Sequence, residues 1–280
     1  MNATTTHTCK SCLHQFEGKF CNNCGEKRYN EKDKKLSHVI HEAFHFITHL
    51  DNKFLKTVGL IFFKPGFVSE QYCNGIRKKY FKPISLFLIA VVIYLLFPLL
   101  QGMNISFFNH ISTNDKIGVS YSHSWALERM AKTGMTEYQL AEKFDTASPK
   151  FAKVLLLMLL PLSALPLSLL FRKKRRYFFD HFILATELNT VFLLLFFLLL
   201  PLLFIGASKL FGFNLTYGDD PYYGVLQLVL FLFLLTAAFR RFYKLSFLWS
   251  ILGSLAFVVC YLVVLWLYRQ LVFIVVMLSI

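Results

Sequence analysis

Long segments without a charged side chain constrain this protein more than any other feature. Five segments of 18 to 32 residues contain no Asp, Glu, Lys or Arg: residues 83–114, 154–171, 188–208, 221–239 and 245–268. A helix needs about 20 mostly apolar residues to cross a bilayer, and an isolated segment in lipid must satisfy its own backbone hydrogen bonds. The sequence therefore predicts an all-α integral membrane bundle with about five transmembrane helices, near residues 84–100, 153–171, 181–205, 222–239 and 247–268.

The composition supports the same class. Hydrophobic residues make up 56% of the 280 residues and charged residues only 16%, whereas an ordinary soluble domain carries about 25% charge. A disordered chain is excluded because such chains are polar and rich in charge. Residues 271–280 are apolar but too short to span, so they extend the last helix, fold back or lie along the interface. The first 80 residues hold no apolar run typical of a signal peptide, so the first span is expected to be an uncleaved anchor.

Basic residues alternate along the chain as the positive-inside rule describes. Residues 1–83 carry 14 Lys+Arg against 7 Asp+Glu, residues 172–176 are all basic, and residues 240–244 hold three more basic side chains. Residues 101–151 have five basic and five acidic residues. We therefore expect a multi-pass protein of the cytoplasmic (inner) membrane, with a cytoplasmic N-terminus and with residues 101–151 and the C-terminus outside. Topology and anionic lipid headgroups explain the net charge of +14, which argues against a nucleic-acid partner.

Two Cys-x-x-Cys pairs stand near the N-terminus. Cys9 and Cys12 are followed after eight residues by Cys21 and Cys24, with Gly25 directly after them. Four thiolates at this spacing are typical of one tetrahedral structural zinc site. A pair of disulfides conflicts with a reducing cytoplasm, and a redox Cys-x-x-Cys does not explain two pairs. We therefore expect residues 1–30 to form a cytoplasmic zinc ribbon whose folding depends on the metal.

Residues 36–82 are expected to form amphipathic juxtamembrane helices. Residues 36–63 place apolar side chains at helical spacing beside a stripe of histidines. Within the stripe, His41-Glu42-x-x-His45 matches a zinc-protease motif, in which the two His bind metal and the Glu activates water. Glu70 is a conceivable third ligand. The competing interpretation is an interfacial helix whose polar edge happens to use histidine.

The end of this juxtamembrane segment is basic and aromatic. Residues 64–66, Lys-Pro-Gly, break the first helix, and residues 67–74 are expected to form a second, short one. A basic run then leads into the first span. We expect this run to anchor the chain at lipid headgroups through Arg77, Lys78, Lys79 and Lys82.

The third predicted span carries an intramembrane polar site made of Asp180, His181, Glu187 and Asn189. An ionisable residue inside a span is costly, so Glu187 is a functional-site hypothesis by default. It could carry a proton, bind a metal with His181 or accept a substrate group, or it could simply hydrogen-bond another helix. We expect Glu187 to face the bundle. By polarity alone, its candidate partners are Tyr94, Gln227 and Tyr261.

Three sets of residues resemble a bacterial membrane family catalogued as domain of unknown function 3667. They are Cys9, Cys12, Phe16, Gly18, Cys21, Cys24 and Gly25 in the head; Thr57, Pro65, Gly66, Tyr72, Gly75, Arg77, Tyr80 and Pro83 in the next segment; and Asp180-His181 in a later span. The resemblance covers residues 9–100 well and the rest loosely. It implies a zinc-ribbon head followed by several spans, with no established activity. It also implies His or acidic residues near positions 180–189, whereas the His41-Glu42-x-x-His45 motif is not part of the pattern.

These observations divide the chain into a cytoplasmic zinc ribbon at residues 1–30, amphipathic helices at 36–82 and a transmembrane bundle at 83–280. A non-enzymatic role is favoured, in which the ribbon binds a cytoplasmic protein partner or organises a homo-oligomer. The first alternative is a transporter or channel with a polar centre at Glu187. The second is a membrane-bound metal-dependent hydrolase that uses His41, Glu42 and His45.

Overall fold

The computed structural model describes residues 6–28, 52–96, 103, 106–211 and 221–280. This part of the chain is nearly all helical, apart from a small two-stranded hairpin near the N-terminus. The elements in chain order are β1 (His7–Thr8), β2 (Gln15–Phe16), α2 (Asn52–Phe63), α3 (Phe67–Cys73), α4 (Pro83–Leu96), α5 (Phe107–Lys116), α6 (Tyr121–Thr133), α7 (Glu137–Leu155), η2 (Leu156–Met158, a 3-10 turn), α8 (Leu159–Phe171), α9 (Phe178–Leu194), η3 (Leu195–Leu199, a π-helical turn), α10 (Leu200–Phe211), α11 (Pro221–Phe242) and α12 (Phe247–Ser279).

Four helical stretches are long and apolar enough to cross a membrane: Glu137–Phe171, Phe178–Ala207, Tyr223–Phe242 and Phe247–Ser279. They correspond to four of the five predicted spans. The remaining one is described as the apolar helix α4 of 14 residues, about 21 Å long at 1.5 Å per residue, against a hydrocarbon core of about 30 Å. The described residues therefore hold four helices of spanning length where the sequence predicted about five.

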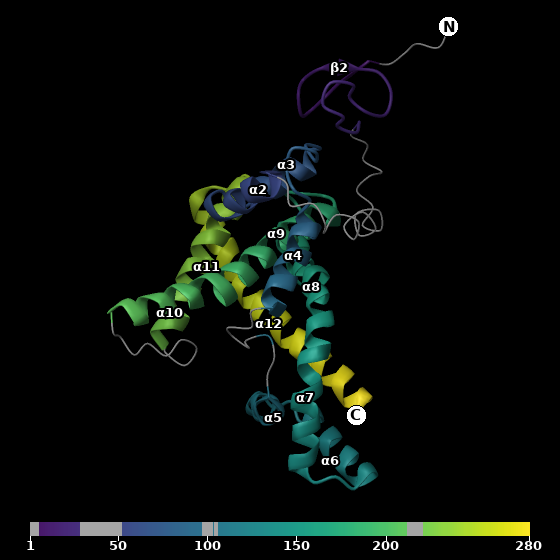
Figure 1. Ribbon diagram of the computed structural model, residues 1–280, viewed down its shortest axis with the longest axis vertical. Coiled ribbons are helices and arrows are strands. Elements are labelled where there is room, and N and C mark those ends of the chain that lie inside the picture. The colour runs from purple at the N-terminus through teal and green to yellow at the C-terminus, as the bar shows by residue number, and fades with distance from the viewer. Residues whose placement is uncertain (1–5, 29–51, 97–102, 104–105, 212–220) are drawn as a thin grey trace.

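Helix α9 lies at the centre of the bundle and packs against α3, α4 and α8 (Figure 1). Of its 17 residues, 15 are buried. Polar side chains that are buried in this way cannot hydrogen-bond to water. Its few polar side chains must therefore find their partners on neighbouring elements.

The ribbon head and helices α5 and α6 lie at opposite ends of the long axis of the molecule (Figure 1). The chain thus passes from one end to the other between α3 and α5. Helix α12 runs without interruption to Ser279, so residues 271–280 extend the last helix. Its buried C-terminal side chains pack at the end that carries α5, α6 and α7.

The predicted helix break at Lys64-Pro65-Gly66 and the short helix after it are confirmed, since α2 ends at Phe63 and α3 runs from Phe67 to Cys73. Gly66 has φ +79°, and a Cβ atom at this position would lie 2.7 Å from the backbone oxygen of Ala238. Only glycine combines this backbone conformation with such a close approach to α11. Residues 36–51, the first part of the predicted amphipathic helix, lie outside the described residues.

Candidate metal centre and buried polar anchors

The N-terminal head is a ribbon built on short backbone pairings. Strands β1 and β2 are antiparallel, with His7 opposite Phe16, and Phe20 forms an isolated bridge with Lys27. The buried apolar cluster of this head consists of Phe16 and the cysteine side chains. So small a core cannot offset the entropy of ordering the chain, so the fold needs a further source of stability.

The two Cys-x-x-Cys turns have equivalent backbone hydrogen bonds. In the first, Cys9 N–H donates to the carbonyl of His14 (2.9 Å) and Leu13 N–H donates to the carbonyl of Cys9 (2.9 Å). In the second, Cys21 N–H donates to Glu26 (2.8 Å) and Gly25 N–H donates to Cys21 (2.7 Å). Leu13 and Gly25 occupy the same place in the two turns and have positive φ values of 62° and 67°. The sequence therefore builds one knuckle twice and presents the four thiols to a common centre.

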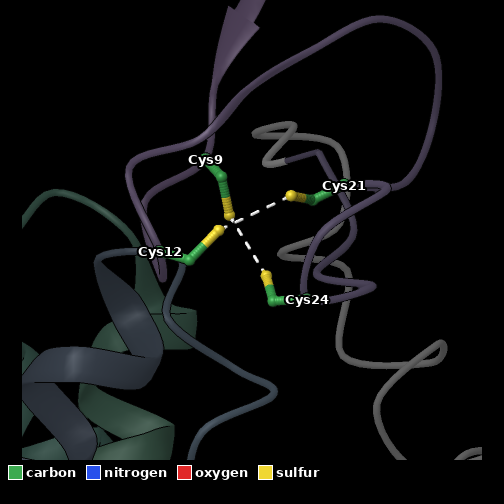
Figure 2. A group of neighbouring side chains, drawn as sticks. All are labelled: Cys9, Cys12, Cys21 and Cys24. Atoms are coloured by element: carbon green, nitrogen blue, oxygen red, sulfur yellow. Dashed lines mark hydrogen bonds between the residues drawn. The ribbon is translucent and has the colours of Figure 1, made fainter.

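The four sulfur atoms converge on one point (Figure 2), and all lie within 4.8 Å of one another. The Sγ atoms of Cys9 and Cys24 are 3.5 Å apart, and those of Cys12 and Cys21 are 3.6 Å apart. Four thiolates around a zinc ion with Zn–S bonds of about 2.3 Å would lie about 3.8 Å apart, close to these distances. A disulfide would need about 2.05 Å, and all four are free thiols. These cysteines could hold one metal ion, and the donor set suits a closed tetrahedral site.

The ribbon contacts the bundle through a carboxylate. Glu26, which follows the second knuckle, is buried, and its side chain accepts a hydrogen bond from the backbone N–H of Lys78 (2.9 Å). Lys78 lies in the loop between α3 and α4. The backbone carbonyl of Glu26 also accepts the hydrogen bond from Cys21. One residue thus belongs both to the metal knuckle and to the contact with the juxtamembrane loop.

The four basic residues predicted as a headgroup anchor do not share one environment. The Arg77 guanidinium lies over the rings of Tyr72 (5.3 Å) and Phe179 (5.8 Å), and so ties the loop to the start of α9. Lys78 takes part in the ribbon contact through its backbone. Lys79 is exposed, and its ammonium lies 5.9 Å from the ring of Tyr80. Lys82, the residue directly before α4, is half-buried. Arg77 therefore has a packing role that its sequence context did not reveal.

Glu187 is buried inside the bundle, and its carboxylate binds the N-terminal turn of α3. The backbone N–H groups of Gly66 and Ser69 donate to its two oxygens at 2.6 and 2.8 Å, and the Ser69 hydroxyl donates at 2.5 Å. The first N–H groups of a helix lack intrahelical partners and carry partial positive charge, so a carboxylate satisfies both needs at once. The candidate partners predicted from polarity, Tyr94, Gln227 and Tyr261, were wrong, because the donors are the backbone of Gly66 and the backbone and hydroxyl of Ser69.

Two cations from the end of α11 and the residues after it hold the same segment. Arg241 donates to the carbonyl oxygen of Pro65 at 2.6 Å, and the ammonium of Lys244 lies 2.5 Å from the carboxylate of Glu70. Glu70, considered from sequence as a third metal ligand, is thus an ion-pair partner of Lys244. The α2–α3 turn is held from one side by α9 and from the other by α11.

Asn189 lies two residues after Glu187 and faces a different part of the bundle. Its amide nitrogen donates to the hydroxyl of Ser163 on α8 (2.7 Å), and its amide oxygen accepts from the hydroxyl of Tyr261 on α12 (2.9 Å). The side chain therefore links three helices. Hydrogen bonds of this kind between helices are a common way of fixing their packing in lipid.

Asp180 and His181 lie at the start of α9 and contact the basic segment before it. Asp180 pairs with Arg175 at 3.6 Å. The Nε2 atom of His181 lies 3.1 Å from the carbonyl of Arg175, and its Nδ1 atom lies 2.8 Å from the hydroxyl of Tyr243. A carbonyl can only accept, so Nε2 carries the proton, and Nδ1 accepts from the tyrosine. This cluster fixes the turn between α8 and α9 against the end of α11.

The four polar residues predicted on this span are therefore all buried on α9, but they do not form one site. Asp180 and His181 contact Arg175 in the turn before α9, Glu187 faces α3, and Asn189 faces α8 and α12. The residues missed from sequence are Gly66 and Ser69. Two features of the sequence could have pointed to them. A helix begins after Pro65-Gly66 without a capping side chain of its own, and one carboxylate lies deep in a predicted span. His41, Glu42 and His45 lie outside the described residues.

A second polar network, also missed from sequence, lies at the opposite end of the molecule. The side-chain amides of Asn114 on α5 and Gln270 on α12 bond each other at 2.9 and 3.1 Å. The Asn114 amide nitrogen also lies 3.1 Å from His110 Nε2 and from the Ser122 hydroxyl. The His110 ring stacks on Phe273, with 4.4 Å between ring centroids. Burial lowers the pKa of His110 to about 4, with a further lowering from Arg269, so the ring is neutral at pH 7.

Comparison with known proteins bears on the segment that docks against Glu187. No curated protein and no solved structure was found to match the chain. The matched family model spans α2, α3 and all but the last residue of α4. The resemblance drawn from the sequence is thereby confirmed over this segment: residues 51–95 match the family described as "Protein of unknown function (DUF3667)".

Proposed function

We propose that this protein is a membrane-embedded binding protein whose zinc-stabilised ribbon receives a cytoplasmic protein partner. The observation that carries the proposal is the surface of the ribbon. Leu13, directly after the first pair of cysteines, is 77% exposed, and Phe20, directly before the second pair, is 59% exposed. Two large apolar side chains held in place by a rigid metal knuckle are suitable anchors for a protein contact. A closed four-thiolate site has no open coordination position, which favours a binding role over catalysis.

The attachment of the ribbon supports this role. Glu26 connects the second knuckle to the loop before α4, and the next segment is held by Glu187, Arg241 and Lys244. A partner that binds the ribbon would therefore be positioned with respect to the membrane helices. We place the ribbon in the cytoplasm, because the basic segments of the chain gather on its side of the spans.

The hydrogen bonds of Glu187 favour a binding protein over a transporter or channel. Both of its oxygens accept hydrogen bonds from the α3 turn, so it offers little capacity to a passing ion or substrate. Releasing the carboxylate would leave two buried N–H groups without an acceptor, at a cost of about 1–3 kcal/mol for each. Zinc is the proposed metal, because the separations between the four sulfurs suit it and thiolates are among its preferred ligands.

The test is quantitative co-purification of the intact protein from native membranes. Three forms are compared: the unchanged chain, Leu13→Ser/Phe20→Ser, and Leu55→Ser/Phe63→Ser as the matched control. Leu55 and Phe63 are exposed apolar residues of α2. The proposal expects a discrete stoichiometric partner that is lost with the ribbon variant and kept with the control. It is contradicted if both double variants retain the same partner, or if the unchanged protein brings down none.

A further inference from the structure

A groove separates the end of α8 from the start of α12. Its volume is ≈ 1040 Å³, at the upper end of the range of small-molecule pockets. One wall comes from the last turn of α8 and the residues that follow it, and the other comes from the first three turns of α12. Neither the ribbon nor the contacts of Glu187 involve this groove.

The floor of the groove is fixed by a glycine. A Cβ atom on Gly253 would lie 2.8 Å from the ring of Phe171, so the absence of a side chain lets this ring pack directly against α12. On its other side the Phe171 ring stacks on Tyr243, with 4.3 Å between centroids and 21° between planes. The two helices are therefore close at the floor, and the groove opens outward from a rigid aromatic base.

The walls are apolar and face outward. Leu169 on α8 is 80% exposed and Trp249 on α12 is 65% exposed, and Leu252 lies one turn further along α12. All three lie within the stretches of spanning length, which end at Phe171 and begin at Phe247. At this depth exposed apolar side chains contact lipid chains. Trp249, three residues into its span, stands where tryptophans gather at the membrane–water interface.

The mouth of the groove carries positive charge. Arg172, Lys173 and Lys174 line it directly after the end of the α8 span, and all three are exposed. None of the described residues that line the groove is acidic. Positive side chains at the level of the headgroups, above an apolar channel between two helices, are complementary to a ligand with an anionic head and a hydrocarbon chain.

We propose that this groove is a binding site for one anionic phospholipid. The acyl chain lies along Leu169, Trp249 and Leu252, and the phosphate is bound by Arg172, Lys173 and Lys174. The site differs from a general attraction of anionic lipid to a basic protein, because the groove places the three cations and the apolar walls around a single lipid molecule. The proposal is independent of the function proposed for the ribbon.

Trp249 provides a direct readout. The chain has three tryptophans, and Trp125→Phe together with Trp266→Phe leaves Trp249 as the one emitter. The full-length protein is placed in vesicles of equal phosphatidylcholine and phosphatidylglycerol, with bromine carried by one lipid or by the other. The overall composition is then identical, and only the position of the quencher changes. We expect brominated phosphatidylglycerol to quench Trp249 at least twofold more strongly than brominated phosphatidylcholine.

Three variants decide whether the preference belongs to the groove. Arg172→Gln/Lys173→Gln/Lys174→Gln should make the two lipids quench equally. The α2 variant, Lys53→Gln/Lys56→Gln/Lys64→Gln, removes three exposed cations from α2 and the residue directly after it and should keep the preference. Ala256→Phe fills the groove with the cations in place and should reduce it. The proposal is overturned if the two lipids quench Trp249 equally in the unchanged protein. It is also overturned if the preference for phosphatidylglycerol survives the 172–174 variant, or if the α2 variant lowers it as much as the 172–174 variant does.

Discussion

The backbone N–H of Gly66 donates a 2.6 Å hydrogen bond to the carboxylate of Glu187, 121 positions further along the chain. This contact joins the segment that matches the DUF3667 model to the central helix of the bundle. It also explains why a carboxylate occurs so deep in a span: the first turn of α3 has N–H groups that need an acceptor and no side-chain cap of its own. Glu187 supplies the cap from another helix.

Replacing Glu187 should destabilise the protein whether or not the new side chain is polar. Glu187→Ala leaves two buried N–H groups without an acceptor and should cost about 3 kcal/mol or more. Glu187→Gln should cost about 2 kcal/mol, because its amide nitrogen would face N–H donors where a carboxylate oxygen accepts. Thermal unfolding in detergent measures both effects.

The matched control for this prediction is Glu128→Gln on α6. Glu128 is more than half exposed and pairs with Lys132 one turn away, and such surface ion pairs contribute little to stability. Its replacement should therefore leave the unfolding temperature almost unchanged. An unfolding temperature of Glu187→Gln equal to that of the unchanged protein would show that the carboxylate does not cap α3.

Gly66 and Gly59 should respond in opposite ways to the same substitution. Gly66→Ala places a methyl group 2.7 Å from the backbone of Ala238 and at φ +79°, and we expect a loss of about 2 kcal/mol or more. Gly59 lies inside α2 with no atom within 4 Å of the added Cβ. Gly59→Ala should therefore be neutral or should stabilise by up to about 1 kcal/mol. A Gly66→Ala protein as stable as Gly59→Ala would contradict the close packing of the α2–α3 turn on α11.

Stability should fall in mild acid because of His110. Burial lowers its pKa to about 4 in the folded protein, whereas the unfolded chain protonates near pH 6.5. Above pH 6.5 both states are neutral at this residue. Between pH 6.5 and 4 only the unfolded state gains the proton, so the folded state should lose up to about 3 kcal/mol of stability.

Comparing the unchanged protein with His110→Phe isolates this effect. Phenylalanine keeps the ring that stacks on Phe273 but does not titrate. The unfolding temperature of the unchanged protein should fall relative to that of His110→Phe as the pH falls from 7 to 4.5. A difference that stays constant over this range would mean that His110 protonates as easily in the folded state as in the unfolded chain.

The predicted topology can be tested at Tyr138, which is 79% exposed on α7. Ser122, in the same external segment, is unsuitable because it is buried in the network around Asn114. A membrane-impermeant maleimide added to intact cells should label Tyr138→Cys, and should label Lys19→Cys in the ribbon only after the membrane is opened. Labelling of Lys19→Cys in intact cells would mean that the ribbon lies outside the cell, opposite to the predicted orientation.

The sequence predicted those features that depend on residue spacing along the chain. The cysteine pairs, the apolar runs and the Pro-Gly break each follow from local periodicity or local backbone preference, so they could be recognised without a structure. The partners of Glu187, Asn189 and Glu26 could not. Each pairs with a residue that is distant in the chain, and in two of the three cases the donor is a backbone N–H, which no sequence pattern marks.

The predicted span near residues 84–100 is described only in part, as helix α4 of 14 residues, and residues 97–100 lie outside the described residues. Apolar composition predicts that such a segment avoids water, but it does not fix where a helix begins and ends. The ring packing of Arg77 was not predicted either, because one of the two aromatic rings belongs to Phe179, which is distant in the chain.

Metal analysis of the purified full-length protein tests the central claim most directly, because the proposed ribbon depends on zinc bound by Cys9, Cys12, Cys21 and Cys24. We predict about one zinc per chain, as expected for one four-thiolate site. Cys9→Ser should lose the metal, and Cys260→Ser, which changes a cysteine of α12 that is not part of the four-cysteine cluster, should retain it. A protein purified without bound zinc, or a zinc content unchanged by Cys9→Ser, would contradict the account.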